Sequence, residues 1–597
     1  MEFIQPHEEL KNGTSDAQLE RARSSPGQIR IVQIMALIGK SPISGELRMN
    51  DVKSDNYKWV VLSNTTIAML MASIDTSIVI ISLPYILRSV LRHTPGGTAP
   101  LTSSAYAIAS ADSFVYVIWS LMGYMLITAT LLIFFGRLAD LKGRVKIYNA
   151  GFALFTIGSL LAGFSGIIIP NSLITEGLQL VLFRLFQAVG AAMLWSNSAA
   201  LLTDAFPSNQ RGLALGTNMV SGVGGSILGL VLGGIITSVA SWRYIFFINV
   251  PIGIFATVWA YKRLHEVSKP SRNESLDTIG AVLFSGSIAS LLLGSTFYTL
   301  GGMTAGLSAS SGIFYSTFHP YLLLSYVGFI VSPLLMVAFV INESHFAKYP
   351  LMKFSLFRRR AFSTGVLASS LLAIGRGGIM FLLVFYFEGV KGLSAFNAGL
   401  QLIPMSLGFL LVGPISGVLS DRVGYRGLTT AGVILSAVVL VFLSVLPQNA
   451  PPLEVSGVLA LAGIGGGLFG SPNISSVMGS MGANERGVGA ATNSTMLNVA
   501  SMMALTIAFV FIGTTVKISN FITLFVGTVR NLPASVVQSA AYQAQWRTFM
   551  GSFHSVFAIF SVVVILALFP SILRPKGTSP NLAIETSYDV SGKAEDS

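Results

Sequence analysis

The sequence predicts an all-α membrane protein with fourteen transmembrane helices. Of its 597 residues, 52% are hydrophobic and only 10% are charged, whereas a soluble domain carries about 25% charged residues. The hydrophobic residues gather in runs close to the roughly 20 residues that a membrane-spanning helix needs, and not in the alternating segments of about ten residues of a transmembrane barrel. A soluble multidomain enzyme is thereby excluded. Cysteine is absent, which excludes disulfide scaffolds, thiolate metal sites and cysteine nucleophiles.

Residues 1–57 are polar and predict a cytoplasmic N-terminal tail. No apolar run follows Met1, as a secretory signal would require. Within this tail, Ile31–Gly39 is apolar but too short to cross the bilayer. It predicts a short interfacial helix, with plain disorder as the alternative.

The apolar runs then follow one another along the chain. The first six predict an N-terminal six-helix half over residues 58–262, with runs near 59–86, 114–136, 147–169, 178–202, 215–239 and 244–260. Residues 263–361 predict a linker that carries two extra transmembrane helices, near 279–298 and 320–341. The last six predict a C-terminal half over residues 362–574, with runs near 362–387, 396–419, 428–447, 455–478, 488–515 and 551–573. Residues 575–597 form a polar C-terminal tail.

Lysine and arginine are concentrated on one side of this arrangement. Clusters follow the second and sixth spans and precede the ninth: Arg137, Lys142, Arg144 and Lys146; Lys262, Arg263, Lys269 and Arg272; Lys353, Arg358, Arg359 and Arg360. Because cytoplasmic loops carry the excess of basic residues, both termini are predicted to lie in the cytoplasm. The formal net charge of +12 thus belongs to short juxtamembrane clusters, and no nucleic-acid partner is expected.

Three charged residues fall inside the predicted spans: Asp75 in span 1, Arg184 in span 4 and Arg376 in span 9. Each costs about 2.5–3.5 kcal/mol at a helix centre on insertion scales, so each is a candidate functional residue. The alternative is a purely structural pair, with Asp75 neutralised by Arg184. The two interpretations are compatible, because a carboxylate whose proton competes with an arginine can couple protonation to movement.

One short pattern occurs twice, after spans 2 and 10, as GRLADLKG and GVLSDRVG. The positions of interest are Gly136, Asp140, Gly143 and Arg144 in the first copy and Gly417, Asp421 and Gly424 in the second. The glycines permit close helix approach, and the aspartate can pair across a helix end. The pattern predicts a conformational latch in each half, and the repetition itself is typical of secondary transporters.

Span 5 places small residues four positions apart. Gly225, Gly229 and Gly233 share one helical face, with Gly234 beside them. Such spacing predicts a close helix–helix crossing.

Four motifs together resemble the major facilitator superfamily, and specifically its fourteen-spanner drug–proton antiporter family. They are DTSIVIISLP from Asp75 to Pro84, the first loop pattern from Gly136 to Lys146, RLFQAVG from Arg184 to Gly190, and WRYIFFINVPIG from Trp242 to Gly253. The resemblance covers residues 58–574. One departure stands out: Leu230 occupies the position of the proline in the antiporter motif of span 5.

The resemblance implies that two six-helix halves and two extra central helices form the fold, and that spans 1, 4, 9 and 12 line a central cavity. Asp75 and Arg184 would then couple to protons, and Gln187, Arg376 and Asn473 would face the substrate. Glu388, at the end of span 9, is either solvated or, if buried, a second protonatable group or a substrate contact.

The expected function is a proton-coupled exporter of amphipathic small molecules that works by alternating access. Alternatives are a carrier for metabolite uptake or facilitated exchange, which Leu230 makes more plausible, and a non-transporting membrane receptor or scaffold. We expect no enzyme activity and no cofactor beyond a proton gradient, because no phosphate-binding loop, nucleophile–base pair or histidine cluster is present. Expected partners are the lipid bilayer, protons and a small-molecule substrate, for a monomer in the plasma membrane. The segment 516–550 predicts a long outer loop.

Overall fold

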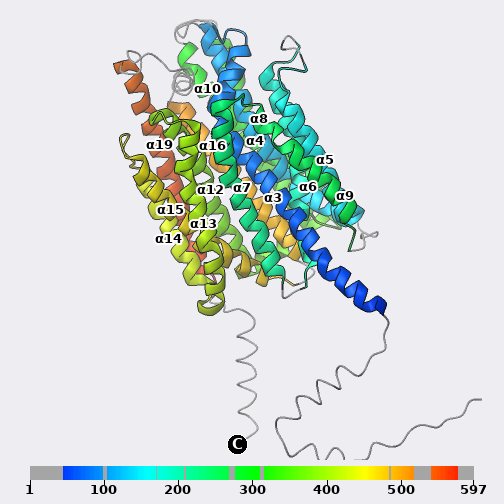
Figure 1. The fold of residues 1–597 in the computed structure, drawn as a ribbon. Coiled ribbons are helices and arrows are strands. Elements are labelled where there is room, and N and C mark those ends of the chain that lie inside the picture. Colours follow the sequence, from blue (N-terminus) through cyan, green and yellow to red (C-terminus); the bar gives the residue numbers. More distant parts are fainter. Residues whose placement is uncertain are drawn as a thin grey trace, which may run out of the picture. The chain divides into compact units, whose positions relative to one another are not determined.

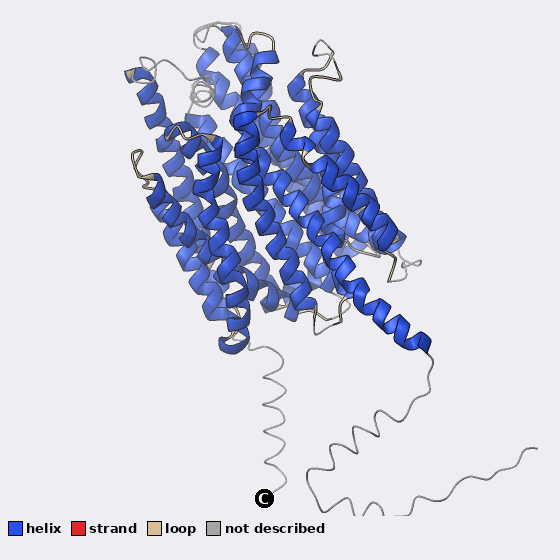
Figure 2. Ribbon diagram, viewed as in Figure 1, coloured by secondary structure: helices blue, strands red, loops and turns tan. Residues whose placement is uncertain are grey.

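A computed structural model of the chain describes residues 45–98, 104–169, 171, 173–207, 210–267, 276–308, 315–482, 486–515 and 539–575. Every regular element in these ranges is a helix (Figure 2). The chain divides into two compact units, Met1–Trp59 and Val60–Ser597, and all contacts discussed below lie within the second. The predicted interfacial helix at Ile31–Gly39 lies outside the described residues.

The N-terminal six spans come first along the chain (Figure 1). They are formed by α3 (Gly45–His93), α4 (Ser104–Lys142), α5 (Arg144–Gly163), α6 (Glu176–Ala205), α7 (Arg211–Val239), α8 (Tyr244–Phe247) and α9 (Asn249–Arg263). The short α8 and the longer α9 together make the sixth span.

The extra pair and the C-terminal six spans follow. The extra pair consists of α10 (Thr278–Ser308) and α11 (Tyr315–Ile341), which ends in the π-helix η2 (Asn342–Phe346). The C-terminal spans are preceded by η3 (Phe354–Arg358) and comprise α12 (Arg360–Val384), the π-helix η4 (Phe385–Val390), α13 (Ala395–Val423), α14 (Tyr425–Leu443), α15 (Pro452–Gly479), α16 (Arg486–Thr515), α19 (Ala540–Leu566) and α20 (Leu568–Leu573).

The described residues contain 14 helical stretches long and apolar enough to cross a membrane, which confirms the predicted number. Their ends differ from the apolar runs in places. Helix α3 begins at Gly45, earlier than the predicted 59, because a helix can continue through polar residues beyond the hydrocarbon when no breaker stops it. Helix α5 ends at Gly163, short of the predicted 169, because the chain turns there, with Gly166 at a φ of 74°. Helix α19 begins at Ala540, so the predicted outer loop is shorter at its C-terminal end.

The glycines of α7 bring this helix into backbone contact with α3. A side-chain carbon added at Gly225 would lie 2.6 Å from the carbonyl oxygen of Leu70, and one at Gly229 would lie 2.7 Å from that of Ile74. Such distances leave no room for any side chain, so the crossing of α3 and α7 depends on these glycines.

Helix α7 also touches the C-terminal six spans through its other face. A carbon added at Gly234 would meet the backbone of Phe396 in α13, and one added at Gly399 of α13 would lie 2.9 Å from the carbonyl oxygen of Leu230. Leu230 itself is 1% exposed. The position where the motif proline is replaced therefore lies in the α7–α13 contact.

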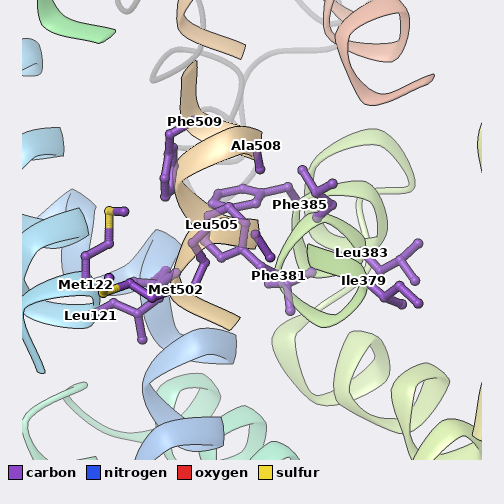
Figure 3. Close-up of a cluster of buried hydrophobic side chains, with 14 of the residues drawn as sticks. Leu121, Met122, Ile379, Phe381, Leu383, Phe385, Met502, Leu505, Ala508 and Phe509 are labelled. Carbon is purple, nitrogen blue, oxygen red and sulfur yellow. The ribbon is translucent and has the colours of Figure 1, made fainter. Parts of the chain in front are cut away.

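A second contact joins the two sets of six spans near the ends that the charge rule predicts to be outside. Here Phe509 of α16 packs edge-on against Phe114 of α4, with ring centroids 5.8 Å apart, and against Phe381 of α12, at 4.9 Å. Leu121 and Met122 of α4 belong to the same buried cluster, and Figure 3 shows them on the α4 side of α16, at the level of Met502. We call Phe114, Leu121, Met122, Phe381 and Phe509 the outer-side cluster; in this structure it holds α4, α12 and α16 together.

The α3–α7 crossing can be tested with a matched pair of variants. We expect Gly225→Ala to lower the melting temperature of the detergent-solubilised protein, because overpacking of this kind costs about 1–3 kcal/mol. Gly224→Ala is the control, since nothing lies within 4 Å of its added carbon. Equal melting temperatures for the two variants would show that the crossing tolerates a side chain.

Candidate functional site

Asp75 of α3 and Arg184 of α6 form an ion pair inside the N-terminal six spans. Arg184 Nη1 lies 2.6 Å from Asp75 Oδ2, and both side chains are 0% exposed. Sequence analysis predicted these two residues as the proton-coupling site, and the structure places them in direct contact. Each of the other ion pairs in the described part of the chain has at least one partner that is exposed to solvent, at least in part.

The second carboxylate oxygen of Asp75 is held by two amide side chains. Gln187 Nε2 donates to Oδ1 at 2.8 Å, and Asn249 Nδ2 of α9 donates to the same oxygen at 2.9 Å. Both amides also donate to Ser159 Oγ of α5, at 3.3 Å and 3.2 Å. Asp75 thus accepts three hydrogen bonds, one from a guanidinium group and two from side-chain amides.

Arg184 is anchored on its other sides as well. Its Nε donates to the carbonyl oxygen of Ser120 at 3.2 Å, and Nη1 also donates to Gln187 Oε1 at 2.7 Å. The guanidinium carbon lies 4.1 Å from the ring centroid of Tyr124. Nη2 has no hydrogen-bond partner among the described residues. Protonation of Asp75 would remove the counter-charge and leave this arginine buried and unbalanced.

Helix geometry explains why these side chains meet. Arg184 and Gln187 are three residues apart on α6 and therefore share a face. A carbon added at Gly158 of α5 would lie 2.6 Å from the Cα atom of Gln187, so the glycine lets α5 approach closely enough for Ser159 to reach the amide. Sequence reasoning missed Asn249 and Ser159; the presence of Asn249 in the WRYIFFINVPIG motif was the available signal.

Arg376 lies in α12 among the C-terminal six spans. Its guanidinium carbon is 5.1 Å from the ring centroid of Phe409 in α13, and Nη1 lies 2.6 Å from where a carbon on Gly466 of α15 would stand. No hydrogen bond or ion pair joins the Arg376 side chain to another residue that the structure describes. Its positive charge is therefore not balanced by a described acidic group, unlike that of Arg184.

Asn473 of α15 contacts a buried arginine that sequence reasoning missed. Its amide oxygen accepts a hydrogen bond from Nη2 of Arg574, which directly follows α20 and is 1% exposed. Burial lowers the pKa of Arg574 to about 10, so it remains a cation at neutral pH. Because the oxygen of Asn473 is engaged in this way, its role in substrate binding stays a prediction. The signal for Arg574 was weak, since it lies at a span end where basic residues are common.

Glu388 lies in the π-helix η4 that continues α12. The side chain is 3% exposed, and Oε1 has no hydrogen-bond partner among the described residues. Of the alternatives left open by the sequence, the structure favours a buried carboxyl group over a solvated one.

The first loop pattern forms a charge cluster at the end of α4. Arg144 Nη1 lies 2.7 Å from Asp204 Oδ2 at the end of α6, and Arg144 Nε donates to Asp140 Oδ1 at 2.9 Å. Gly143 has a φ of 107°, which only glycine adopts readily, so the chain can turn between α4 and α5. Gly136 lies near Ser196 of α6. Asp204 was missed, because it lies far from the pattern in sequence.

Glu266, which follows α9, caps the start of α5 beside this cluster. Its carboxylate oxygens accept hydrogen bonds from the backbone amides of Arg144, Val145 and Lys146 at 3.1, 2.9 and 3.2 Å. A carboxylate at a helix N-terminus is favourable. The segment leading to the extra helix pair is thus tied to the predicted latch.

The second copy of the pattern has a similar backbone. Gly424 has a φ of 79° between α13 and α14, and a carbon added at Gly417 would lie 3.3 Å from Ser471 of α15. The side chain of Asp421 lies outside the described part of the structure. A latch in the C-terminal six spans therefore remains a prediction.

A small pocket lies apart from Asp75, between α4, α10 and α16. Its volume of about 30 Å³ would hold about two water molecules. The lining residues are Phe114, Val115, Ile118, Trp119, Met122, Ser295, Thr296, Thr299, Thr506 and Phe509. Among the described residues no group of three or more His, Cys, Asp or Glu side chains could hold a metal ion.

Comparison with known proteins finds a family model, described as the Major Facilitator Superfamily, that matches residues 65–505. The riboflavin transporter RibZ of Clostridioides difficile is 31% identical over 74% of this chain and 85% of its own length. Multidrug resistance protein 3 of Bacillus subtilis is 28% identical over 72% of this chain and 79% of its own. The cephamycin export protein CmcT of Amycolatopsis lactamdurans is 32% identical, over 62% and 71%.

Solved structures share the fold at low sequence identity. A bacterial homologue of the human lysosomal transporter Spinster has a TM-score of 0.55 at 15% identity, covering 87% of this chain and 97% of that one. A D-xylose–proton symporter also has a TM-score of 0.55 at 15% identity, covering 87% and 98%.

The contribution of the Asp75–Arg184 ion pair to the stability of the protein can be tested by substitution. Asp75→Asn leaves Arg184 buried without a counter-charge, so we expect a loss of about 3–5 kcal/mol. Thermal unfolding of the purified protein in detergent measures this loss. Because the double variant with Arg184→Gln buries no charge, it should recover part of the stability. If Asp75→Asn melts at the wild-type temperature, the pair is not the main anchor of this network.

Proposed function

This chain belongs to the major facilitator superfamily, and from that premise we propose that it is a proton-coupled exporter of amphipathic small molecules. It is a carrier with no enzymatic activity and no cofactor. The observation that carries the proposal is the fully buried network around Asp75 and Arg184. A buried charge pair that a single proton can dissociate offers the differential free energy that drives a conformational change.

The names of the relatives support transport of organic molecules. They include exporters of the antibiotics cephamycin and tetracenomycin C, multidrug resistance proteins and a riboflavin transporter. We therefore assign an organic small molecule as the substrate of this chain, and an amphipathic one because the substrate enters from or leaves into a lipid bilayer.

Proton coupling is assigned to Asp75. When its carboxylate takes up a proton, the hydrogen bonds from Arg184, Gln187 and Asn249 lose their ionic partner. The free energy of the Arg184 guanidinium group then falls if it turns toward another anion or toward water. Because the network joins α3, α5, α6 and α9, such a change alters the packing of most of the N-terminal half.

Selection of the substrate by its charge is assigned to Arg376 in the C-terminal half. Asp75 is already neutralised, whereas Arg376 has no described acidic partner. The charges near the centre of the bundle are thus positive in sum, which favours neutral or anionic amphiphiles over cations.

The Arg144 cluster is assigned a latch function. Asp140, Arg144 and Asp204 connect the ends of α4 and α6, while Glu266 connects the linker to α5. Such contacts stabilise one arrangement of the half against another.

A second candidate function is exchange or uptake of a metabolite. Two observations favour it: the similarity to a riboflavin transporter, and Leu230 in the contact between α7 and α13. Without the motif proline, α7 keeps all its backbone hydrogen-bond donors and bends less readily. We further propose that the protein functions as a monomer in the plasma membrane, with both termini in the cytoplasm.

Transport in reconstituted liposomes tests the main proposal. With an acidic interior and an alkaline exterior, an antiporter should accumulate anionic or neutral dyes against their gradient. We expect Asp75→Asn to lose this accumulation while it still exchanges dye down a gradient. Accumulation by wild type only when the proton gradient is reversed would instead support uptake, and undiminished accumulation by Asp75→Asn would remove Asp75 from the coupling.

Charge selectivity is tested separately with Arg376→Ala. The ratio of initial rates for an anionic and a cationic dye should fall about 10- to 150-fold, since a charge-assisted contact is worth about 1.5–3 kcal/mol. Arg422→Ala is the control, because Arg422 is an exposed arginine of the same half. An unchanged ratio in Arg376→Ala contradicts the assignment.

A further inference from the structure

Glu388 is a buried carboxyl group like Asp75, but its polar partners differ. Asp75 is paired with an arginine and accepts two further hydrogen bonds. Glu388 is 3% exposed, but no ion pair joins it to a described residue and its Oε1 lacks a hydrogen-bond partner in that part of the chain. An ionised carboxylate in such an enclosure is costly, whereas the neutral acid is not.

The groups that face Glu388 do not supply a counter-charge. From α3, Tyr85 lies near both Glu388 and Arg88, and a neutral phenol carries no charge. On its own element, the ammonium group of Lys391 lies 5.5 Å from the ring centroid of Tyr386, which directs it to the ring. Helix α13, which packs against η4, carries charged residues only at its far end, at Asp421 and Arg422.

Glu388 lies where the two halves meet. Tyr85 belongs to the N-terminal half, and its hydroxyl group lies against the backbone amide of Ala395 at the start of α13. The outer-side cluster joins the same halves through Phe114 and Phe509. Phe509 also packs against Phe381, which lies two helical turns before Glu388 on the same chain segment. Separation of the halves at these contacts is the route by which we expect water to reach Glu388 from the predicted outer side.

The π-helix is a second distinctive feature of this position. Regular α-helix ends at Val384, and residues Phe385–Val390 continue with the wider winding. Such segments are uncommon and frequently occur at functional sites. Here the wider winding contains the one acidic residue of the segment.

We propose that Glu388 is a second proton-carrying group, whose protonation is coupled to closure of the outer side. When the halves separate, its carboxyl group meets water, where a glutamate ionises with a pKa of about 4.3. When the halves close, a carboxylate oxygen takes one proton from the outer solution and is buried as the neutral acid. The role of this step in transport rests on the proposed function, but the coupling of closure to proton uptake does not.

Distance measurements between spin labels test the coupling without any substrate. Because the chain has no cysteine, Leu173→Cys and Val445→Cys introduce two labels at exposed positions of the predicted outer side, one in each half. In wild type, raising the pH should move the population from a short to a long distance. For a single proton the equilibrium shifts by up to about tenfold per pH unit.

Two variants decide the outcome. Glu388→Gln, which mimics the neutral acid, should keep the short distance at every pH. Glu454→Gln is the control, because Glu454 is an exposed glutamate of the same half at the start of α15. The proposal is overturned if wild type shows no pH-dependent shift or if Glu388→Gln shifts as wild type does.

Thermal unfolding gives an independent reading. If the proposal holds, Glu388→Gln keeps its melting temperature as the pH rises, while that of wild type falls because the closed state must give up its proton. Parallel curves for the two proteins contradict it. If the distance between the labels changes with pH but the protein does not transport, the proposed function is refuted and the role of Glu388 in closure stands. If the protein transports but the distance does not change with pH, the role of Glu388 is refuted and the proposed function stands.

Discussion

The ion pair between Asp75 and Arg184 is the interaction on which the N-terminal half depends. In a medium without water, each charge is tolerable only because the other is present. The amides of Gln187 and Asn249, and the hydroxyl of Ser159, complete the network. Helices that lie far apart in the sequence are thereby required to meet at one point. In the proposed function one proton would disturb this arrangement, because the bonds that hold the helices would lose their ionic partner when Asp75 is neutralised.

Close backbone approach makes this network possible. The glycine at 158 lets α5 lie against α6 near Gln187, and the glycines of α7 let that helix lie against α3 beside the segment that carries Asp75. In hydrocarbon, helices associate through packing and polar contacts and not through the hydrophobic effect. Glycines at the crossings are therefore as necessary as the charged groups. A larger side chain there would hold the helices further apart, and the polar atoms would no longer be within hydrogen-bonding distance.

The two halves treat buried charge differently. In the N-terminal half, Asp75 is paired with Arg184, and at the predicted cytoplasmic end Arg144 is paired with Asp140 and Asp204. In the C-terminal half, Arg376 and Glu388 have no described counter-charge, and the described hydrogen bond of Arg574 goes to a neutral amide. We infer that the missing partners come from outside the protein: an anionic or polar substrate for Arg376 and a proton for Glu388. In the proposed function, Asp75 takes up a proton in one half. In the other half, Arg376 contacts the substrate and Glu388 takes up a proton as the outer side closes.

The sequence by itself determined the fold class, the number of spans and the family, because hydrocarbon imposes length and apolarity on each helix locally and the motifs are local strings. It also singled out Asp75, Arg184 and Arg376, since a charge inside an apolar run is conspicuous. Only the tertiary structure decided which charges are paired. Asp204, Asn249 and Arg574 meet partners that lie far away in the sequence, and the position of Glu388 at the end of a span left its burial open. Pairing in a membrane interior is a property of how helices cross, and that is set by packing over the whole bundle.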